Sequence, residues 1–385
     1  MSSTFREQIR EFLTANDPGR APKDPAERLR WQRDWAALLV DEGFAAPSWP
    51  SEWGGMDLSL SEQVVYHEEF AKVKRPPHPG PGISVVGPTI IKHGTDTQRE
   101  RFLRAGLRGD IIWVQGFSEP EAGSDLPSLR TRAERDGDNY VVSGQKIWIT
   151  NARNADWLFA LVRTGTRESR QHGISYLLIE LASRGVTVRP LQDMTGGSSF
   201  CEIFLDEVRV PAEHLIGAEN EGWKIARTSL GHERSTAGVA SGMRYRRIVD
   251  ELHALAAELG RTSDPRVRQQ LAAIEIEVRL IILNNTRTLS TVLAGSDPGP
   301  VSSIGRLMFT EFEKRLHELA VNLIGAPATL APQDPHSVQR GRWVTGFLAT
   351  RASTIGAGTA EIQRNTIAEQ VLGLPRDEIL TSATS

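Results

Sequence analysis

The stretch from Trp113 to Asn151 constrains the fold of this chain more than any other part of the sequence. It begins with an apolar run, Trp113 to Gly116, which leads into a loop rich in Pro, Gly, Ser and Asp. Two further strand-like runs follow, and Asp136-Gly137 separates them, which is a strong signal for a β-hairpin. Because ligand contacts concentrate on loops that a rigid sheet carries, we expect a binding site here.

The segment from residue 113 to about 216 has the pattern of a β-domain. Its apolar runs are short, rich in β-branched and aromatic residues, and bounded by turns. These runs are Tyr140–Val142, Ile147–Ile149, Trp157–Val162, Ile174–Ile179, Val186–Val188 and Cys201–Val210. Because no helices alternate with them, the sequence predicts an antiparallel sheet or small barrel and argues against a dinucleotide-binding α/β unit.

Both flanks of this β-domain carry helical periodicity instead. The predicted helices include Pro25–Glu42, a capped helix from Ser61, one long helix over Glu221–Leu259, and Arg266–Leu293, Val301–Ile324, Arg340–Ile355 and Thr359–Val371. Long amphipathic helices in this number form a bundle. The sequence therefore predicts an α+β fold with an N-terminal helical domain (1–112), a middle antiparallel β-domain (113–216) and a C-terminal helical bundle (217–385).

The composition argues against several classes of function. The 385 residues include 45 basic and 48 acidic side chains, and this balance indicates neither a nucleic-acid partner nor a membrane surface. No apolar run of about 18 residues predicts a membrane span, and the charged N-terminal residues do not fit a signal peptide. With Cys201 as the single cysteine, no disulfide within the chain and no cysteine metal site can form. We therefore expect a cytoplasmic protein without a metal.

Two motifs of the central stretch resemble the flavin-binding signatures of the acyl-CoA dehydrogenase family. The first is WVQGFSEPEAGSD at residues 113–125, and the second is GQKIWITN at residues 144–151. The resemblance extends over nearly the whole chain and ends in TIGAGTAEIQRN at residues 354–365. Several long motifs in the same order make the match specific, and the predicted three-part architecture is that of the family.

The resemblance implies FAD as cofactor and α,β-dehydrogenation of an acyl-CoA thioester, a reaction of lipid metabolism. A carboxylate removes the α-proton while the β-hydrogen leaves as hydride to flavin N5, because protein side chains cannot accept hydride. The thioester α C–H is weakly acidic, so the site must stabilise the enolate and desolvate the base. Electrons then pass to an external acceptor such as electron-transfer flavoprotein.

The resemblance also assigns residues to the flavin and to the substrate. Ser124 corresponds to a position that contacts the CoA arm, Trp148 covers the isoalloxazine ring, and Thr150 lies near its N5. The expected flavin contacts are Gln115, Phe117, Ser118, Trp148, Thr150 and Thr359. A structural interpretation stays open beside each assignment, because Phe117 and Trp148 can pack within a sheet and Ser118 and Ser124 can form turns.

The catalytic base is where this sequence departs from a common pattern of the family. Many members carry a glutamate directly before the Gly-Thr that corresponds to Gly358-Thr359, but here the residue is Ala357, which cannot remove a proton. Its backbone N–H can still donate to the thioester oxygen, so Ala357 and Gly358 are expected substrate contacts. Isovaleryl and long-chain members carry the glutamate on the long helix before an arginine, as Glu233-Arg234 stands here.

Glu233 has a sequence context that suits a base. No cation that would neutralise it occurs among its helical neighbours, which are Ser229, Leu230, Thr236 and Ala237. The alternative to a catalytic base is a glutamate exposed to solvent on the helix surface, where most glutamates lie. Arg234 is expected to position the base or to bind the CoA phosphates, and the alternative is a surface arginine.

A second departure concerns the flavin pyrophosphate. Many relatives carry an arginine, Phe-Gly and a downstream glutamine after the long helix, and these bind the pyrophosphate of a neighbouring subunit. Residues 259–268 read LGRTSDPRVR without Phe-Gly, and spacing does not choose among Arg261, Arg266 and Arg268. The resemblance implies a homotetramer or dimer assembled through the bundle, and a hetero-oligomer with a second dehydrogenase-like chain stays open.

Two competing classes of function are compatible with the same sequence. A flavin oxidase or monooxygenase can use this fold, and family analogy alone does not exclude it. A subunit without activity of its own, which serves as partner of a second dehydrogenase-like chain, is the other class. The sequence specifies neither the length or branching of the acyl chain nor whether CoA or a carrier protein bears the thioester.

Overall fold

The computed structural model describes residues 2–232, 237–296 and 299–376. The chain divides into two compact units, Met1–Arg234 and Ser235–Ser385, and each has a hydrophobic core of its own. Within the described residues, no helix is both long enough and apolar enough to cross a membrane.

The first unit begins with helices whose ends follow local sequence signals. These helices are α1 (Ser2–Ala15), α2 (Pro25–Asp41), α3 (Leu60–Lys72), α4 (Gly87–His93) and α5 (Asp96–Arg108). The Asp24 side chain caps α2, which has Pro25 in its first turn. A capping box starts α3, but its cap is Ser59 and not Ser61 as predicted, because Ser59 reciprocates hydrogen bonds with Glu62.

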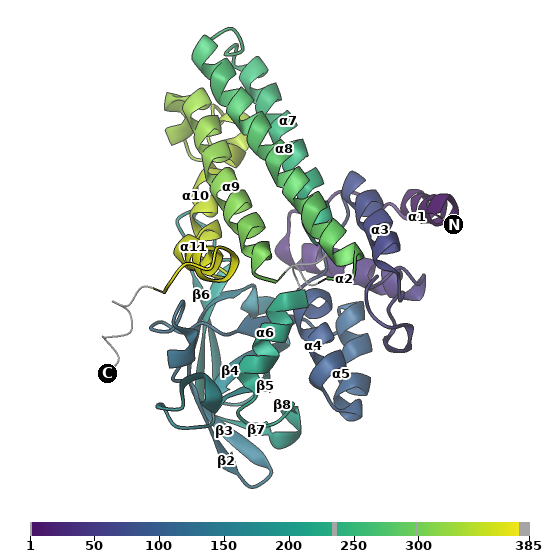
Figure 1. The fold of residues 1–385 in the computed structure, drawn as a ribbon, viewed down its shortest axis with the longest axis vertical. Coiled ribbons are helices and arrows are strands. Elements are labelled where there is room, and N and C mark those ends of the chain that lie inside the picture. Colours follow the sequence, from purple (N-terminus) through teal and green to yellow (C-terminus); the bar gives the residue numbers. More distant parts are fainter. Residues whose placement is uncertain (1, 233–236, 297–298, 377–385) are drawn as a thin grey trace. The chain divides into compact units, whose positions relative to one another are not determined.

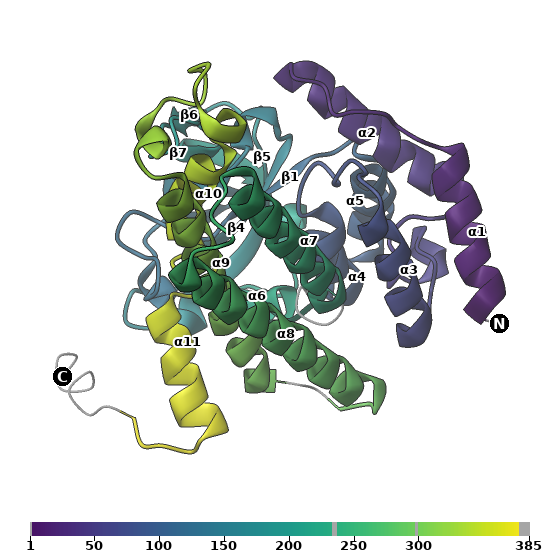
Figure 2. The same cartoon turned by 90° about the horizontal axis from the view of Figure 1, so that it is seen from above.

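Helices α1 and α3 lie side by side in the first unit (Figure 2). Phe12 of α1 stacks on Phe44 and packs in one cluster with Trp35 of α2 and Tyr66 of α3. Across the same contact, α1 and α3 share a group of charged side chains around Glu69. Apolar burial thus joins the three N-terminal helices, and ion pairs add to the contact between α1 and α3.

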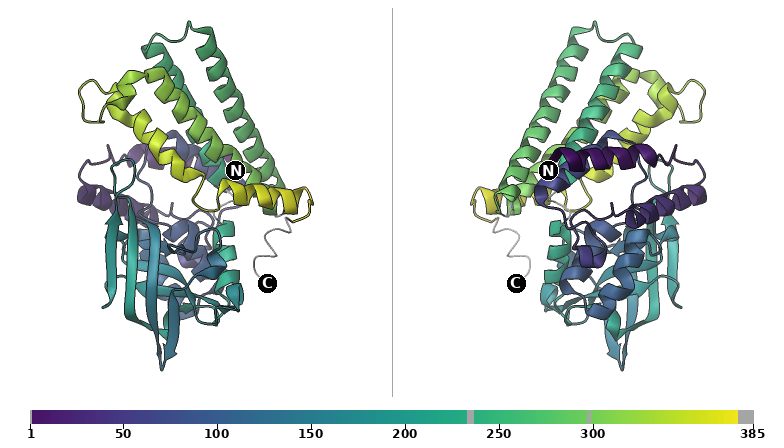
Figure 3. Two further views of the ribbon diagram at one scale, coloured as in Figure 1. Left: turned by 90° about the vertical axis from the view of Figure 1, so that its left-hand side faces the viewer. Right: turned by 90° about the vertical axis from the view of Figure 1, so that its right-hand side faces the viewer.

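Figure 3 shows the sheet of the first unit from two sides. The sheet has eight strands: seven follow the order β6-β7-β3-β2-β4-β5-β8, and β1 pairs with β4. The strands are β1 (Trp113–Gly116), β2 (Arg132–Asp136), β3 (Asn139–Thr150), β4 (Trp157–Arg163), β5 (Ile174–Glu180), β6 (Val186–Leu191), β7 (Phe200–Pro211) and β8 (Leu215–Ile216). Most neighbouring strands are antiparallel, as predicted. The pairs β1–β4 and β2–β4 are parallel, a detail that strand periodicity cannot predict.

Strand β3 differs from the prediction in two respects. Asp136 pairs with Asn139, so the hairpin turn is Gly137-Asp138, one residue later than expected. The runs predicted as two strands, Tyr140–Val142 and Ile147–Ile149, form one strand with two shifts of register. The first shift includes Gly144, where an added Cβ would lie 2.6 Å from the Thr131 Cα, so the chain needs glycine there.

Strand β4 is buried on both of its faces. One face packs against aromatic residues of the helices and of β1, among them Phe102 of α5 and Trp113. The other face packs with apolar side chains of β3, β5 and β7. Helix α6 (Gly222–His232) packs against β5 and α4, so helices cover part of the sheet.

The second unit is a helical bundle, as predicted. Its helices are α7 (Ala237–Glu258), α8 (Pro265–Leu293), α9 (Ser302–Ile324), α10 (Arg342–Ser353) and α11 (Ala360–Thr366). Helices α7 and α8 run antiparallel (Figure 1), and an added Cβ on Gly242 would lie 3.3 Å from Ile282 Cγ1, so α7 packs closely on α8 there. The predicted helix Glu221–Leu259 is helical as α6 and α7, and residues 233–236 between them lie outside the described residues.

We predict that Glu69→Gln destabilises the protein in a pH-dependent way. The carboxylate is 3% exposed and accepts hydrogen bonds from Arg10, Lys72 and Arg6. Burial raises the pKa of Glu69, but these hydrogen bonds outweigh burial and hold the pKa at about 2. We expect a loss of about 1–3 kcal/mol in the free energy of unfolding at neutral pH.

The stabilising effect of Glu69 should be complete above its ordinary pKa of 4.5 and should decline as the pH falls towards 2. Denaturant unfolding at pH 7 and at successively lower pH measures this difference. Glu68→Gln is the matched control, because Glu68 is more exposed and contacts Arg6. A difference between wild type and Glu69→Gln that does not change with pH would contradict the prediction.

Candidate active site

The first predicted flavin segment lies on β1 and in the loop that follows. Strand β1 runs parallel to β4, with Gln115 opposite Phe159, and Gln115 and Ser118 are half-buried. The Phe117 ring is buried and makes edge contacts with Phe159 at 5.9 Å and with Tyr176 at 6.0 Å between ring centroids. The side chain of Phe117 is therefore a core residue, and any flavin contact by Phe117 falls to its backbone.

The second predicted flavin segment lies at the second register shift of β3. Trp148 sits in this shift with φ +63° and is 60% exposed. A tryptophan in the left-handed region is strained, and strain of this kind clusters at ligand sites. The alternative interpretation of Trp148, as a residue packed within the sheet, therefore fails. Among the described residues of its unit, the only ring that contacts the indole is that of Phe200, which meets it edge-on.

Hydrogen bonds hold the two segments side by side. The Ile147 N–H donates to the Ser118 carbonyl at 3.1 Å, and Lys146 Nζ donates to the Phe117 carbonyl at 3.3 Å. The structure thus brings Phe117 and Ser118 next to the residues that precede Trp148. Thr150 is exposed further along β3, opposite Phe200 in the register.

The loop after the first segment carries Ser124, the predicted CoA contact. Ser124 is exposed in a turn between the bridge Glu119↔Ala122 and Asp125, whose carboxylate pairs with Arg170 at 2.8 Å. This environment is compatible both with a turn residue and with a residue free to meet a ligand.

In the second unit, the predicted substrate contacts Ala357 and Gly358 form a left-handed turn between α10 and α11. Ala357 has φ +53° and Gly358 has φ +92°. Within the described part of the chain, the Ala357 N–H donates to no acceptor. Gln363 Nε2 donates to the carbonyls of Ala357 at 3.5 Å and Gly358 at 3.3 Å, and Thr359 caps α11 by accepting from the Ile362 N–H.

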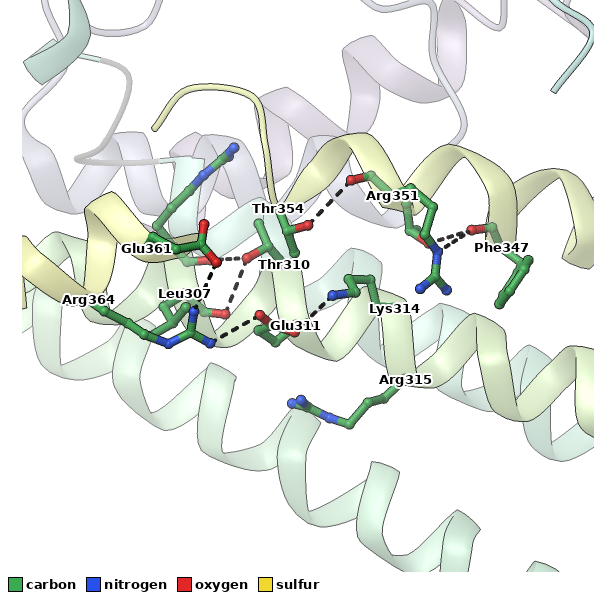
Figure 4. Close-up of polar contacts among 12 residues, drawn as sticks. Leu307, Thr310, Glu311, Lys314, Arg315, Phe347, Arg351, Thr354, Glu361 and Arg364 are labelled. Atoms are coloured by element: carbon green, nitrogen blue, oxygen red, sulfur yellow. Dashed lines mark hydrogen bonds and ion pairs between the residues drawn. The ribbon is translucent and has the colours of Figure 1, made fainter. Parts of the chain in front are cut away.

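Helix α9 donates hydrogen bonds to the backbone at the start of this turn. Arg306 Nη2 donates to the carbonyls of Ser353 at 3.3 Å and Gly356 at 2.6 Å, at the start of the turn. Figure 4 shows Glu311 of α9 between Lys314 and Arg364, with which it pairs at 3.4 Å and 3.3 Å. The strained turn is therefore held by polar contacts on both sides.

The structure does not test every predicted site residue. Glu233 and Arg234 belong to residues 233–236, which the structure does not describe. Arg261, Arg266 and Arg268 are all exposed around the start of α8, so the structure does not choose among them either. In the described ranges, no group of His, Cys, Asp or Glu side chains could hold a metal ion.

Comparison with known proteins identifies the family of this chain. Residues 2–110, 115–208 and 220–372 match the N-terminal, middle and C-terminal domains of acyl-CoA dehydrogenases. The chain belongs to the acyl-CoA dehydrogenase family. The predictions of the family, its fold, its FAD cofactor and its enzyme class are thereby confirmed.

Relatives of this acyl-CoA dehydrogenase match it over almost their whole length. It is 36% identical over 382 residues to acyl-CoA dehydrogenase IpdE1 of Mycobacterium tuberculosis, covering 97% of this chain and 98% of the relative. Among solved structures, the ChsE4–ChsE5 complex of Mycobacterium tuberculosis has a TM-score of 0.83 at 31% identity, covering 98% of both chains. The Tcur3481–Tcur3483 steroid ACAD has a TM-score of 0.83 at 30% identity, also covering 98% of both chains.

The described residues of the first unit fit a flavin. Trp148 offers an aromatic face that no ring of its own unit stacks on, and the half-buried Gln115 and Ser118 add polar groups at the neighbouring segment. Sequence reasoning missed Glu119 and Lys146, which form a buried ion pair between the two segments. Their signal was their occurrence within the two motifs, Glu119 directly after the predicted flavin contact Ser118 and Lys146 two residues before Trp148.

We predict that Trp148→Ala impairs the flavin site without destabilising the fold. Because the side chain is mostly exposed, the free energy of unfolding should change by no more than about 0.5 kcal/mol. Bound FAD should lose quenching by the indole and be retained less tightly. Denaturant unfolding of the protein without FAD and fluorescence of bound flavin measure the two effects.

Met194→Ala is the control for this prediction, because Met194 is an exposed apolar residue of the same unit. It should leave both stability and flavin fluorescence unchanged. Normal flavin quenching and retention in Trp148→Ala would show that the exposed indole does not cover the cofactor.

Proposed function

We propose that this acyl-CoA dehydrogenase removes the α-proton of its thioester substrate with Glu233. The observation that carries the proposal is the turn at Ala357, which has no carboxylate but presents a backbone N–H that no described residue uses. The base must then come from elsewhere, and Glu233-Arg234 matches the placement in isovaleryl and long-chain members. FAD supplies the hydride acceptor for the β-hydrogen when it is bound.

The turn supports a role in stabilising the enolate. A donor aimed at a developing oxyanion stabilises the transition state most when it needs no reorganisation during the reaction. Ala357 is held in a strained conformation by contacts from Gln363 and Arg306, so its N–H is fixed in place. We assign Ala357 N–H to the thioester carbonyl oxygen and Gly358 to the same substrate contact.

The remaining assignments follow the two segments of the first unit. We assign Gln115, Ser118 and the backbone of Phe117 to the flavin, and Trp148 to the face of its ring. Thr150 and Thr359 are further flavin contacts. Ser124 contacts the CoA arm, and Arg234 positions Glu233 or binds the CoA phosphates. The division into domains at 1–112, 113–216 and 217–385 is part of the same proposal.

We further propose that the chain works in a complex with a second, non-identical dehydrogenase-like chain. The stretch from 259 to 268 lacks the Phe-Gly by which many relatives bind the flavin pyrophosphate of a neighbouring subunit. Two of the similar solved structures are named as pairs of differently named chains. A homotetramer or dimer is the alternative, and electron-transfer flavoprotein or a similar acceptor takes the electrons in either case.

The name of one of these relatives also suggests the substrate. Because that relative is a steroid ACAD, we propose a polycyclic acyl-CoA derived from a steroid as the substrate class. Anaerobic bleaching of the flavin by a panel of straight-chain, branched and steroid-derived acyl thioesters tests this class. Fast consumption of oxygen by the reduced enzyme, without another acceptor, would favour an oxidase instead.

We predict that Glu233→Gln abolishes dehydrogenation while FAD binding is retained. General-base catalysis contributes about 10²–10⁴-fold to a rate, so bleaching of the flavin by substrate should slow by at least about 100-fold. Stopped-flow absorbance under anaerobic conditions measures the rate. Glu221→Gln is the control, because Glu221 is an exposed glutamate of a neighbouring segment. Bleaching near the wild-type rate in Glu233→Gln would exclude this residue as the base.

We also predict that the chain purified alone carries less than one FAD per protomer. Co-expression with a non-identical dehydrogenase-like chain from the same genome should raise the flavin content to that of a complete complex. Absorbance at the flavin band and native mass spectrometry measure content and stoichiometry. A fully flavinated homo-oligomer of this chain alone would contradict the hetero-oligomer.

A further inference from the structure

A buried ion pair lies between the two predicted flavin segments. The side chain of Lys146 is 0% exposed and that of Glu119 is 7% exposed, and Lys146 Nζ lies 2.7 Å from Glu119 Oε1. Lysine and glutamate are almost never fully buried unless paired. The pair is therefore compatible with burial, but burial of two charges is not in itself a gain in stability.

Every strong donor and acceptor of the pair is occupied by protein groups. The ammonium group donates to Glu119 Oε1, to the Leu161 carbonyl at 2.7 Å and to the Phe117 carbonyl at 3.3 Å. Glu119 in turn accepts from the backbone N–H groups of Thr131 at 2.9 Å and Arg130 at 2.6 Å. Neither side chain keeps a free group for substrate, so the pair is not a catalytic base or a ligand contact.

The charged state of the pair follows from its surroundings. Burial lowers the pKa of Lys146, and the attraction of Glu119 opposes this effect. Burial raises the pKa of Glu119, but the Lys146 ammonium and the hydrogen bonds that the carboxylate accepts hold its pKa below the ordinary value. The carboxylate therefore stays ionised and continues to attract the ammonium group.

The partners of the pair belong to segments that are separate in sequence. Phe117 follows β1, Leu161 lies in β4, Thr131 ends the loop after the first flavin segment, and Lys146 belongs to β3. Thr131 also occupies the space beside Gly144, where an added Cβ would lie 2.6 Å from its Cα. The pair thus links the first flavin loop to the irregular part of β3, which contains Trp148.

We propose that Lys146 and Glu119 are positioning residues of the flavin site. Their ion pair holds the Phe117-Ser118 backbone against the register shift that carries Trp148, so the flavin-contacting groups are in place before FAD binds. The Ile147 N–H bond to the Ser118 carbonyl completes this connection at 3.1 Å. The inference rests on the proposed function, which assigns Phe117, Ser118 and Trp148 to the flavin.

Preorganisation of this kind has a measurable consequence. A site that is already ordered loses less conformational freedom when a ligand binds, so its affinity is higher. The strained backbone conformation of Trp148 also persists only if contacts of the surrounding residues hold it in place. Loss of the ion pair should therefore weaken FAD binding in addition to destabilising the fold.

The test compares FAD affinity with stability in matched variants of the full-length protein, purified in the complex it forms. Glu119→Gln keeps the shape of the side chain and removes its charge, and Lys146→Met removes the ammonium group. We expect Glu119→Gln to raise the dissociation constant of FAD by about tenfold or more and to change the circular dichroism of the bound flavin. Titration of FAD into the protein after its removal measures this constant at a temperature where the variant is folded.

Two controls separate positioning from general destabilisation. Val162→Ala opens a cavity in β4, so it lowers stability without touching the pair. Arg209→Gln breaks an exposed ion pair with Asp136 in the same sheet. Both controls should leave the FAD dissociation constant within about twofold, since neither alters a partner of Lys146 or Glu119.

The double variant Lys146→Met/Glu119→Gln tests whether the two residues act as a unit. If they do, FAD should bind to it no more weakly than to Lys146→Met alone, whereas independent effects would multiply. The inference is overturned if Glu119→Gln binds FAD as wild type does, or if FAD affinity follows stability equally in Glu119→Gln and Val162→Ala.

These outcomes are distinguishable from a failure of the proposed function. If wild type binds FAD but no acyl thioester bleaches it, the proposed reaction fails while the effect of Glu119→Gln on FAD binding still decides the inference. If wild type in its complex binds no FAD, the assignment of the flavin contacts fails and the inference fails with it.

Discussion

The first unit depends on the burial of β4 on both of its faces. Trp157, Phe159 and Leu161 face one hydrophobic core, and Leu158 and Ala160 with Val162 face another. Fully burying side chains of this size contributes about 1.5–3 kcal/mol each, so the strand is a rigid centre for its neighbours. All four residues of β1 pair with β4. The Leu161 carbonyl of β4 also accepts a hydrogen bond from Lys146. The loop that follows β1 therefore starts from a position that the core has already determined.

The predicted ligand contacts combine strained backbone with polar groups that keep the strain in place. Trp148 and Ala357 are both in the left-handed region, which is unfavourable for residues other than glycine. Around Trp148, the connection between Ile147 and Ser118 and the buried pair of Lys146 and Glu119 define the backbone. Gln363 and Arg306 do the same for the turn at Ala357. Both strained positions are thus held by residues of the unit to which they belong.

The sequence predicted the elements of the fold well where the signals are local. Helix α2 begins at the predicted proline, and α8 and α9 differ from their predicted bounds by one residue at their first position. The motifs at 113–125 and 144–151 also predicted the family correctly, because they are long and occur in order. Within the site, the sequence could not separate a packing aromatic from a ligand-facing one. Burial makes Phe117 a core residue and leaves Trp148 exposed.

By itself, the sequence determined the family, the helical flanks, the central β-domain and the loss of a carboxylate at position 357. The helices and strands follow from periodicity and capping residues, which are signals local to each element. The family follows from long motifs that occur in the expected order, and the missing carboxylate is read directly from the residue at position 357. Only the tertiary structure decided that β1 and β4 are parallel, that two predicted strands form one irregular strand, and that Lys146 is buried against Glu119. The physical reason is distance along the chain: Lys146 lies 27 residues from Glu119 and 29 from Phe117, so only folding brings their groups within hydrogen-bonding distance.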